Sequence, residues 1–232
     1  MKIADHIIPD IAGNLHKNGH AIIPQFVSEA DCDELKAGYH RQDRYRKTVY
    51  MERHRFGYGE YKYFNYPLPA LIHSIRETLY PFLVPVANLW MKVLHTGRRF
   101  PDTHKELLEQ CIAHGQHKPT PLILKYGPGG YNTLHQDLYG EIYFPMQAVL
   151  FLSDPVNDHA GGEFVLTEQV PRAQTKATVL KPRKGDILVF TTHFRPAKGK
   201  NAYYRINVKH GVSEVVQGER YTLGIIFHDA LN

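Results

Sequence analysis

Cysteine is scarce in this sequence: its 232 residues include two, Cys32 and Cys111, which are far apart and form no CxxC pair. A disulfide framework and a cysteine-ligated zinc site are therefore disfavoured. Long apolar runs are also missing, because no stretch approaches the roughly 18 consecutive apolar residues of a membrane span. The start, 1–6, has neither the apolar core nor the small-residue cleavage site of a secretory signal. We therefore expect a cytoplasmic protein without a membrane partner.

The composition is that of an ordinary globular protein. Hydrophobic residues make up 43% and charged residues 22% of the chain, so disorder and coiled coil are disfavoured. The net charge of +5 is compatible with a nucleic-acid partner without requiring one. The chain also contains 15 His, so spacing and context must decide which of them could bind a metal.

The part of the chain before residue 119 has a mixed pattern. Helices are predicted after a cap at 28–31, over 67–94 with interruptions at Pro81 and Pro85, and after Asp102. Segments 20–26 and 46–64 are rich in Val, Ile, Tyr and Phe, which is typical of strands. We expect residues 1–118 to pack on the core rather than to fold as an independent domain.

From residue 119 the pattern changes to short β-type runs separated by Gly, Pro, Asn or Asp. Eight such runs are predicted, at 122–126, 131–137, 146–152, 163–167, 177–180, 187–191, 203–210 and 221–228. They predict an α+β fold with a mainly β core over 119–232. The expected architecture is a double-stranded β-helix, or jelly roll, of two antiparallel sheets with the N-terminal helices packed against one face.

A metal site is predicted from His135, Asp137 and His210. Residues two apart on a strand point to the same face, so His135 and Asp137 can reach one ion while Gln136 points away. His210 ends another predicted strand, which a barrel can bring opposite the first pair. Two histidines and one carboxylate leave coordination positions open, an arrangement that suits non-haem Fe(II) and O2 chemistry.

The HxD pair alone is weak evidence, because a strand end with a local hydrogen bond would look the same. Surplus histidines near predicted strand ends are more often ordinary surface groups: His159, His193 and His228. His114 and His117 have no second pair that would complete a site. Arg220 lies ten residues after His210 and starts the last strand, where its guanidinium could bind a carboxylate in bidentate fashion. The alternative for Arg220 is a solvated strand-edge position.

Several motifs resemble one family when they are taken together and in order. They are YGPGG and HQD within 126–137, LSD at 152–154, GGEF at 161–164, PRKGDILVF at 182–190, HGV at 210–212 and GERYTLGIIF at 218–227. This set resembles the 2-oxoglutarate/Fe(II)-dependent dioxygenases, in particular their prolyl-4-hydroxylase-like branch, and it covers roughly the last 110 residues. Where some relatives have a Tyr before LSD to assist the cosubstrate, this chain has Phe151.

The resemblance implies a role for each motif residue. His135, Asp137 and His210 would bind Fe(II), and Arg220 would hold the distal carboxylate of 2-oxoglutarate. Tyr126 would hydrogen-bond the cosubstrate, with Thr222 as a helper on the strand face of Arg220. The enzyme would hydroxylate or oxidatively demethylate its substrate with O2, releasing succinate and CO2, with ascorbate as a supporting reductant.

The substrate must be read from outside these motifs. The segment from Arg41 to Tyr66 alternates basic residues with aromatic rings, which would suit phosphates and unpaired bases. The whole chain also resembles a bacterial group for which nucleic-acid modification has been proposed. Three alternatives stay open: rings that pack on the core with solvated cations, a protein side chain or small molecule as the substrate, and a non-catalytic cupin-like binding module. The sequence does not indicate the oligomeric state.

Overall fold

The computed structural model describes residues 7–137 and 140–231. The starting segment 1–6, on which the expectation of no secretory signal depends, lies outside the described residues. Within these ranges the helices are α1 (Ile7–Asn18), α2 (Glu29–Ala37), α3 (Ala70–Val93) and α4 (His104–Ala113), with short 3-10 turns at Gly38–His40, Gln42–Arg44 and Met51–His54. All of these helices are too short or too polar to cross a bilayer.

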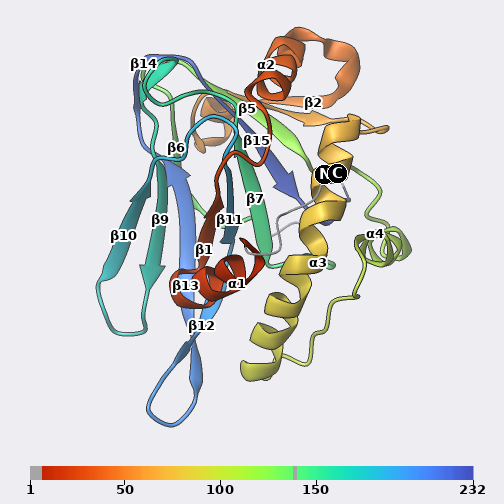
Figure 1. Ribbon diagram of the computed structural model, residues 1–232, viewed down its shortest axis with the longest axis vertical. Coiled ribbons are helices and arrows are strands. Elements are labelled where there is room, and N and C mark those ends of the chain that lie inside the picture. Colours follow the sequence, from red (N-terminus) through yellow and green to blue (C-terminus); the bar gives the residue numbers. More distant parts are fainter. Residues whose placement is uncertain (1–6, 138–139, 232) are drawn as a thin grey trace.

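Most of the strands fall into two antiparallel sheets (Figure 1). Within the described ranges, the larger sheet has the order β1-β11-β7-β15-β5-β4-β2, and the smaller has the order β10-β9-β13-β6-β3 with β12 paired to β13. A separate ladder joins β14 to β8. The bounds are β1 His20–Ile23, β2 Tyr45–Tyr50, β3 Gly57–Tyr58, β4 Glu60–Phe64, β5 Leu122–Tyr126, β6 Tyr131–His135, β7 Met146–Phe151, β8 His159–Gly161, β9 Phe164–Gln169, β10 Thr175–Leu180, β11 Ile187–Thr191, β12 Phe194–Lys198, β13 Tyr203–Val212, β14 Val215–Gly218 and β15 Arg220–Ile226.

Alternation along the central strands divides the core into two layers. On β15, Leu223 and Ile225 belong to the main hydrophobic core, whereas Arg220 and Thr222 line the space between the sheets. On β7, Leu150 likewise joins the main core, while its neighbouring residues Val149 and Phe151 pack with side chains of the smaller sheet. This period of two separates a helix-facing layer from a site-facing layer. The predicted jelly roll of two packed sheets is confirmed.

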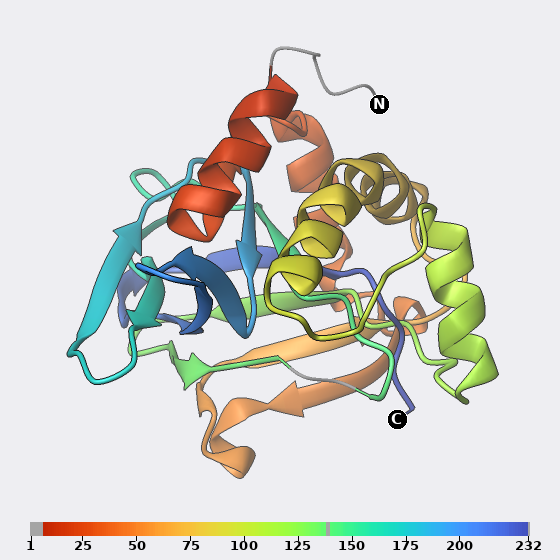
Figure 2. The ribbon, with the colours of Figure 1, turned by 90° about the horizontal axis from the view of Figure 1, so that it is seen from below.

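The helices gather on one side of the strands, with α1 and α3 against the larger sheet (Figure 2). Side chains of α1 and α3, including Leu15, Leu79 and Trp90, share one core cluster with Ile187 and Leu223 of the sheet. The other face of the sheet is left for the smaller sheet and the cavity between them. The helices therefore cover the larger sheet from outside and leave the site open.

Helix α3 corrects the prediction that prolines interrupt the segment 67–94. It is continuous from Ala70 to Val93 with Pro81 and Pro85 inside it. Both prolines lie on the exposed face, where water can bond the carbonyls that lose their helical donors. The opposite face is buried along its length, so its packing outweighs the local cost of the prolines.

Candidate metal centre

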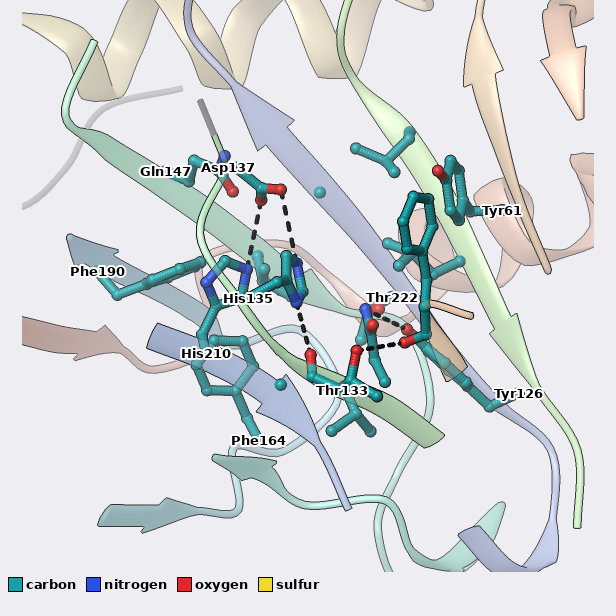
Figure 3. Close-up of a pocket in the computed structure, with 18 of the residues that line it drawn as sticks. Tyr61, Tyr126, Thr133, His135, Asp137, Gln147, Phe164, Phe190, His210 and Thr222 are labelled. Carbon is teal, nitrogen blue, oxygen red and sulfur yellow. Dashed lines mark hydrogen bonds and ion pairs between the residues drawn. The ribbon is translucent and has the colours of Figure 1, made fainter. Parts of the chain in front are cut away.

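His135 and His210 face each other across neighbouring strands. They are directly paired in the antiparallel ladder of β6 and β13, and their ring centroids lie 4.2 Å apart. Asp137 completes the group two residues after His135: its Oδ1 lies 3.5 Å from His135 Nε2 and its Oδ2 lies 3.3 Å from His210 Nε2 (Figure 3). Strand β6 ends at His135, so Asp137 lies in the segment after the strand. The prediction that the strand covers 131–137, and so contains Asp137, is wrong.

The two imidazoles are oriented by their surroundings. His135 donates from Nδ1 to the carbonyl oxygen of Thr133 at 2.8 Å, and its Nε2 is the nitrogen that faces Asp137. His210 is buried, with the ring of Phe164 stacked on it and that of Phe190 tilted against it. Burial lowers the pKa of His210, although its contact with Asp137 opposes the shift. The Nε2 atoms of both rings therefore face the Asp137 carboxylate.

This arrangement fits a divalent cation. Ligand atoms of His135, Asp137 and His210 all lie within 4.8 Å of one another, and no other set of three such side chains converges in this way in the described part of the chain. Nitrogen lone pairs and a carboxylate placed this closely repel one another unless a cation or protons lie between them. Two imidazoles and one carboxylate also form the donor set that non-haem iron prefers.

The triad lines a cavity of about 270 Å³ between the two sheets. Arg220, Thr222 and Tyr126 line the same cavity, and Arg220 pairs with Tyr126 in the ladder of β15 and β5. Arg220 is 2% exposed, and burial lowers its pKa to about 10, so it remains protonated at neutral pH. It donates to Thr222 Oγ1 at 3.4 Å and forms no salt bridge within the described residues. A buried cation without a paired carboxylate is costly, so this cavity suits an anionic ligand.

Aromatic rings flank the guanidinium of Arg220. Its Cζ lies 5.5 Å from the ring centroid of Tyr126 and 5.5 Å from that of Phe151. Phe151 contributes a ring surface but no hydroxyl, and its partner in the ladder of β7 and β15 is Thr222. The Tyr126 hydroxyl accepts from Asn132 Nδ2 at 3.4 Å, and burial raises the pKa of Tyr126 to about 12. Tyr126 thus keeps its proton and can donate it to a ligand.

The sequence reasoning missed several lining residues. Asn132 was not singled out, although its position on the HxD strand could have suggested it. Gln147 was missed because it lies within a continuous apolar run, and a buried amide there was the available signal. Its side chain is 4% exposed and its Nε2 has no hydrogen-bond partner. Phe56 and Tyr61 also line the cavity, although they were noted only as rings of the basic segment.

The surplus histidines stay outside this centre. His159, His193 and His228 do not line the cavity that the triad borders. His159 instead contacts the carbonyl oxygen of Gly161 through Nδ1 at 3.0 Å, and the His228 Nδ1 accepts from the backbone N–H of Phe144. The prediction that they are ordinary surface groups is wrong for His159 and His228, which are buried and bonded to the backbone.

Solved structures of known oxygenases share the fold. A prolyl-4-hydroxylase of Pseudomonas putida matches with a TM-score of 0.56 at 15% identity, covering 94% of this chain and 96% of that chain. A 2OG-Fe(II) oxygenase-family oxidoreductase of Burkholderia pseudomallei matches with a TM-score of 0.53 at 16% identity, covering 100% and 96%. The non-heme alpha-ketoglutarate-dependent epimerase SnoN of nogalamycin biosynthesis matches with a TM-score of 0.57 at 12% identity, covering 96% and 83%. At such low identities these likenesses establish the fold.

The family follows from sequence comparison. Residues 59–230 match the model of the Oxygenase-NA family, described as "Oxygenase, catalysing oxidative methylation of damaged DNA". "Uncharacterized protein Rv2227" of Mycobacterium tuberculosis strain H37Rv is 46% identical over 164 residues, which are 71% of this chain and 70% of that protein. The protein "MT2286" of strain CDC 1551 matches equally. The fold and the family match together show that this chain is a member of the 2-oxoglutarate/Fe(II) dioxygenase superfamily. It is therefore an oxidoreductase. Within that superfamily, the chain belongs to the Oxygenase-NA family.

Proposed function

We propose that His135, Asp137 and His210 bind Fe(II), and that the cavity beside them holds 2-oxoglutarate. The observation that carries the proposal is one cavity with two unlike ends. One end is the converging triad, and the other is the buried cation of Arg220. Fe(II) and a dicarboxylate are together what those two ends require.

Polar side chains at the Arg220 end of the cavity would bind the cosubstrate. Arg220 would hold the distal carboxylate of 2-oxoglutarate in bidentate fashion, with Thr222 orienting its guanidinium and Tyr126 donating a hydrogen bond to the same ligand. Because Phe151 has no hydroxyl, Thr222 is the strand neighbour that is left to supply a second polar contact. The apolar wall of Phe164, Phe190 and Val149 would exclude water.

When bound together, the iron and cosubstrate supply the oxidation: 2-oxoglutarate loses CO2 and becomes succinate with one oxygen atom of O2, and the other oxygen enters the substrate. Oxidation of an N-methyl group in this way gives a hydroxymethyl group, which leaves as formaldehyde. No side chain of the chain is needed as a general base. Ascorbate would serve as a supporting reductant that keeps the iron in the Fe(II) state.

We further propose that the substrate is a methylated base in DNA. The family description names damaged DNA, and the net charge of +5 favours a polyanionic partner. Phe56 and Tyr61 add aromatic surface to the cavity, which suits a base taken out of its stack. Hydroxylation of a protein side chain, such as proline, is the competing outcome of the test.

The test is succinate formation from 2-oxoglutarate by purified protein with Fe(II), ascorbate and O2, beside Asp137→Ala and an anaerobic control. Methylated single-stranded DNA should raise turnover above that with the same unmethylated oligonucleotide, and formaldehyde should appear in equal amount. Stimulation by a proline-containing peptide and not by methylated DNA would overturn the substrate proposal. Metal binding without any 2-oxoglutarate turnover would overturn the catalytic proposal in favour of a binding module.

A further inference from the structure

Two cavities meet at the rings of Phe56 and Tyr61. The first is the metal cavity, and both rings line it. The second also has a volume of about 270 Å³ and is lined by the same two rings together with residues of β2, β4 and their surroundings: Arg46, Lys47, Val49, His54, Tyr63, Thr120 and Ala230. Tyr61 stands at the edge of the metal cavity in Figure 3. The two cavities are therefore adjacent, with Phe56 and Tyr61 at their common boundary.

The second cavity carries positive charge and no lining carboxylate. Arg46 and Lys47 line it, and neither forms a salt bridge within the described residues. Arg46 is held in place because its Nε donates to the carbonyl oxygen of Pro119 at 3.0 Å and its Cζ lies 4.6 Å from the ring centroid of Tyr63. The Lys47 side chain is exposed. An anionic group is thus the favoured occupant.

Phe56 is an exposed ring with a fixed backbone. Its ring is 46% exposed and stacks on the imidazole of His54 at 5.3 Å and 22°. Its carbonyl oxygen accepts from the N–H and the hydroxyl of Thr133, both at 2.8 Å. The next residue, Gly57, has φ 149° and lies so close to β6 that a Cβ would meet the Tyr131 carbonyl oxygen at 2.2 Å. The turn is therefore pinned to the strand that carries His135.

We propose that the second cavity is a nucleotide subsite, which binds the phosphate and sugar next to the base that enters the metal cavity. This inference rests on the proposed function and names the form of its substrate, a single strand rather than a free base. Arg46 and Lys47 contact the phosphate, and Phe56 stacks on a base at the boundary between the cavities. An acidic peptide would satisfy the cations but would leave the exposed part of the Phe56 ring, which His54 does not cover, without a contact.

The test is binding of a fluorescent five-nucleotide DNA strand, with one methylated base at its centre, to the full-length protein without metal. Fluorescence anisotropy gives the Kd at several salt concentrations. Lys47→Gln should weaken binding several-fold and reduce the slope of log Kd against log salt by about 0.7, the contribution of one phosphate contact on a single strand. Phe56→Ala should weaken binding about tenfold, as loss of a stacked base does, without changing that slope. Both side chains are exposed, so neither variant should impair folding.

The matched control is Lys105→Gln, which removes the same charge from an exposed side chain of α4 outside both cavities. If Lys47→Gln and Phe56→Ala bind DNA as this control does, the subsite is overturned. Displacement of the strand by poly-glutamate at equal charge concentration would also overturn it, in favour of a general anion site. Methyl-dependent turnover alongside either result would leave the proposed function intact. Binding that depends on Lys47 and Phe56 without such turnover would retain the subsite and remove the proposed function.

Discussion

The imidazole of His210 lies opposite that of His135, as its direct partner across the ladder of β13 and β6. Because both residues are on the face that borders the cavity, the sheet itself sets the distance between two proposed metal ligands. Asp137, which follows the strand, closes the triad from the adjoining segment. The centre therefore combines two strand-fixed groups with one that depends on the path of the chain after β6.

Asp137→Ala should abolish tight Fe(II) binding and lower succinate formation by far more than tenfold, which corresponds to over about 1.4 kcal/mol of barrier. The reason is that two imidazoles remain without the anionic ligand. Calorimetry with Mn(II) or anaerobic Fe(II) measures the binding. Asp102→Ala, which removes an exposed carboxylate before α4, is the control and should bind metal normally. Activity retained within tenfold would exclude Asp137 as a ligand.

Arg220→Met should weaken 2-oxoglutarate binding by about 10- to 100-fold, the loss expected for charge-assisted hydrogen bonds. It should leave the free energy of unfolding unchanged or raise it, since an apolar chain of similar length replaces a buried, unpaired cation. Calorimetry and urea unfolding measure the two effects separately. Lys125→Met is the matched control, because Lys125 lies on the neighbouring strand and pairs with Glu219 rather than lining the cavity. Normal cosubstrate affinity in Arg220→Met would contradict the assignment.

Gln147→Leu should stabilise the metal-free protein by about 1 kcal/mol, because the substitution removes a buried amide nitrogen that has no hydrogen-bond partner. The new side chain faces the apolar wall formed by Val149 and Phe190. Urea unfolding of the two proteins under identical conditions provides the comparison. A loss of stability greater than 1 kcal/mol would mean that the amide bonds within the fold.

Acid should destabilise the protein through His104 and His228. Burial, reinforced by the charge of Arg76, lowers the pKa of each from 6.5 to about 3. The unfolded chain therefore binds these protons at a higher pH than the folded chain does. Above pH 6.5 both histidines are neutral in the folded and the unfolded chain, and the stability of the neutral state is fully present. As the pH falls from 6.5 toward 3, protonation of the unfolded chain lowers the free energy of unfolding by up to about 1.4 kcal/mol per pH unit for each histidine.

The measurement is the free energy of unfolding between pH 6 and 4.5 for the wild type and for His104→Gln. The variant retains a side chain that can donate to the Phe227 carbonyl, as His104 Nε2 does at 2.8 Å. The two histidines together contribute part of the slope of the unfolding free energy against pH. In the variant this part of the slope should be about half as large, because only His228 remains. Identical slopes would show that His104 does not titrate in this range.

We propose that residues 1–118 and 119–232 fold as one unit. Strand β4 pairs with β5, and β1 pairs with β11, so the larger sheet contains strands from both parts. A fragment of residues 119–232 should accordingly lack cooperative unfolding, which circular dichroism during urea titration would test. A fragment that unfolds cooperatively with the stability of the whole chain would contradict the proposal.

The β core was predictable because its strands carry strong local signals. Strands β5 and β11 begin and end at the predicted residues, since each apolar run is bounded by turn-forming residues such as Pro121 and Gly127. Strand β12 was not predicted because it contains Pro196. That proline is tolerated on an edge strand that pairs only with β13 within the described residues. Local signals thus identify central strands better than edge strands.

The sequence predicted that His135, Asp137 and His210 come together, but it did not predict the residues that surround them. A spacing of two residues brought His135 and Asp137 together as expected, although Asp137 lies beyond the strand end. The position of His210 required the resemblance and the barrel, since no local pattern links it to His135. Phe56 reaches the cavity through a pairing between β3 and β6 that joins distant parts of the chain, which no short-range pattern can indicate.

The alternation along β15 makes this segment intolerant of insertion and deletion while leaving it open to substitution. A single residue inserted between Gly218 and Thr222 would shift the strand by one position against β5 and β7. Arg220 would then turn toward the helices, and the cavity would lose its guanidinium. Homologous chains that retain this chemistry should therefore align across 218–226 without gaps, even where few residues are shared.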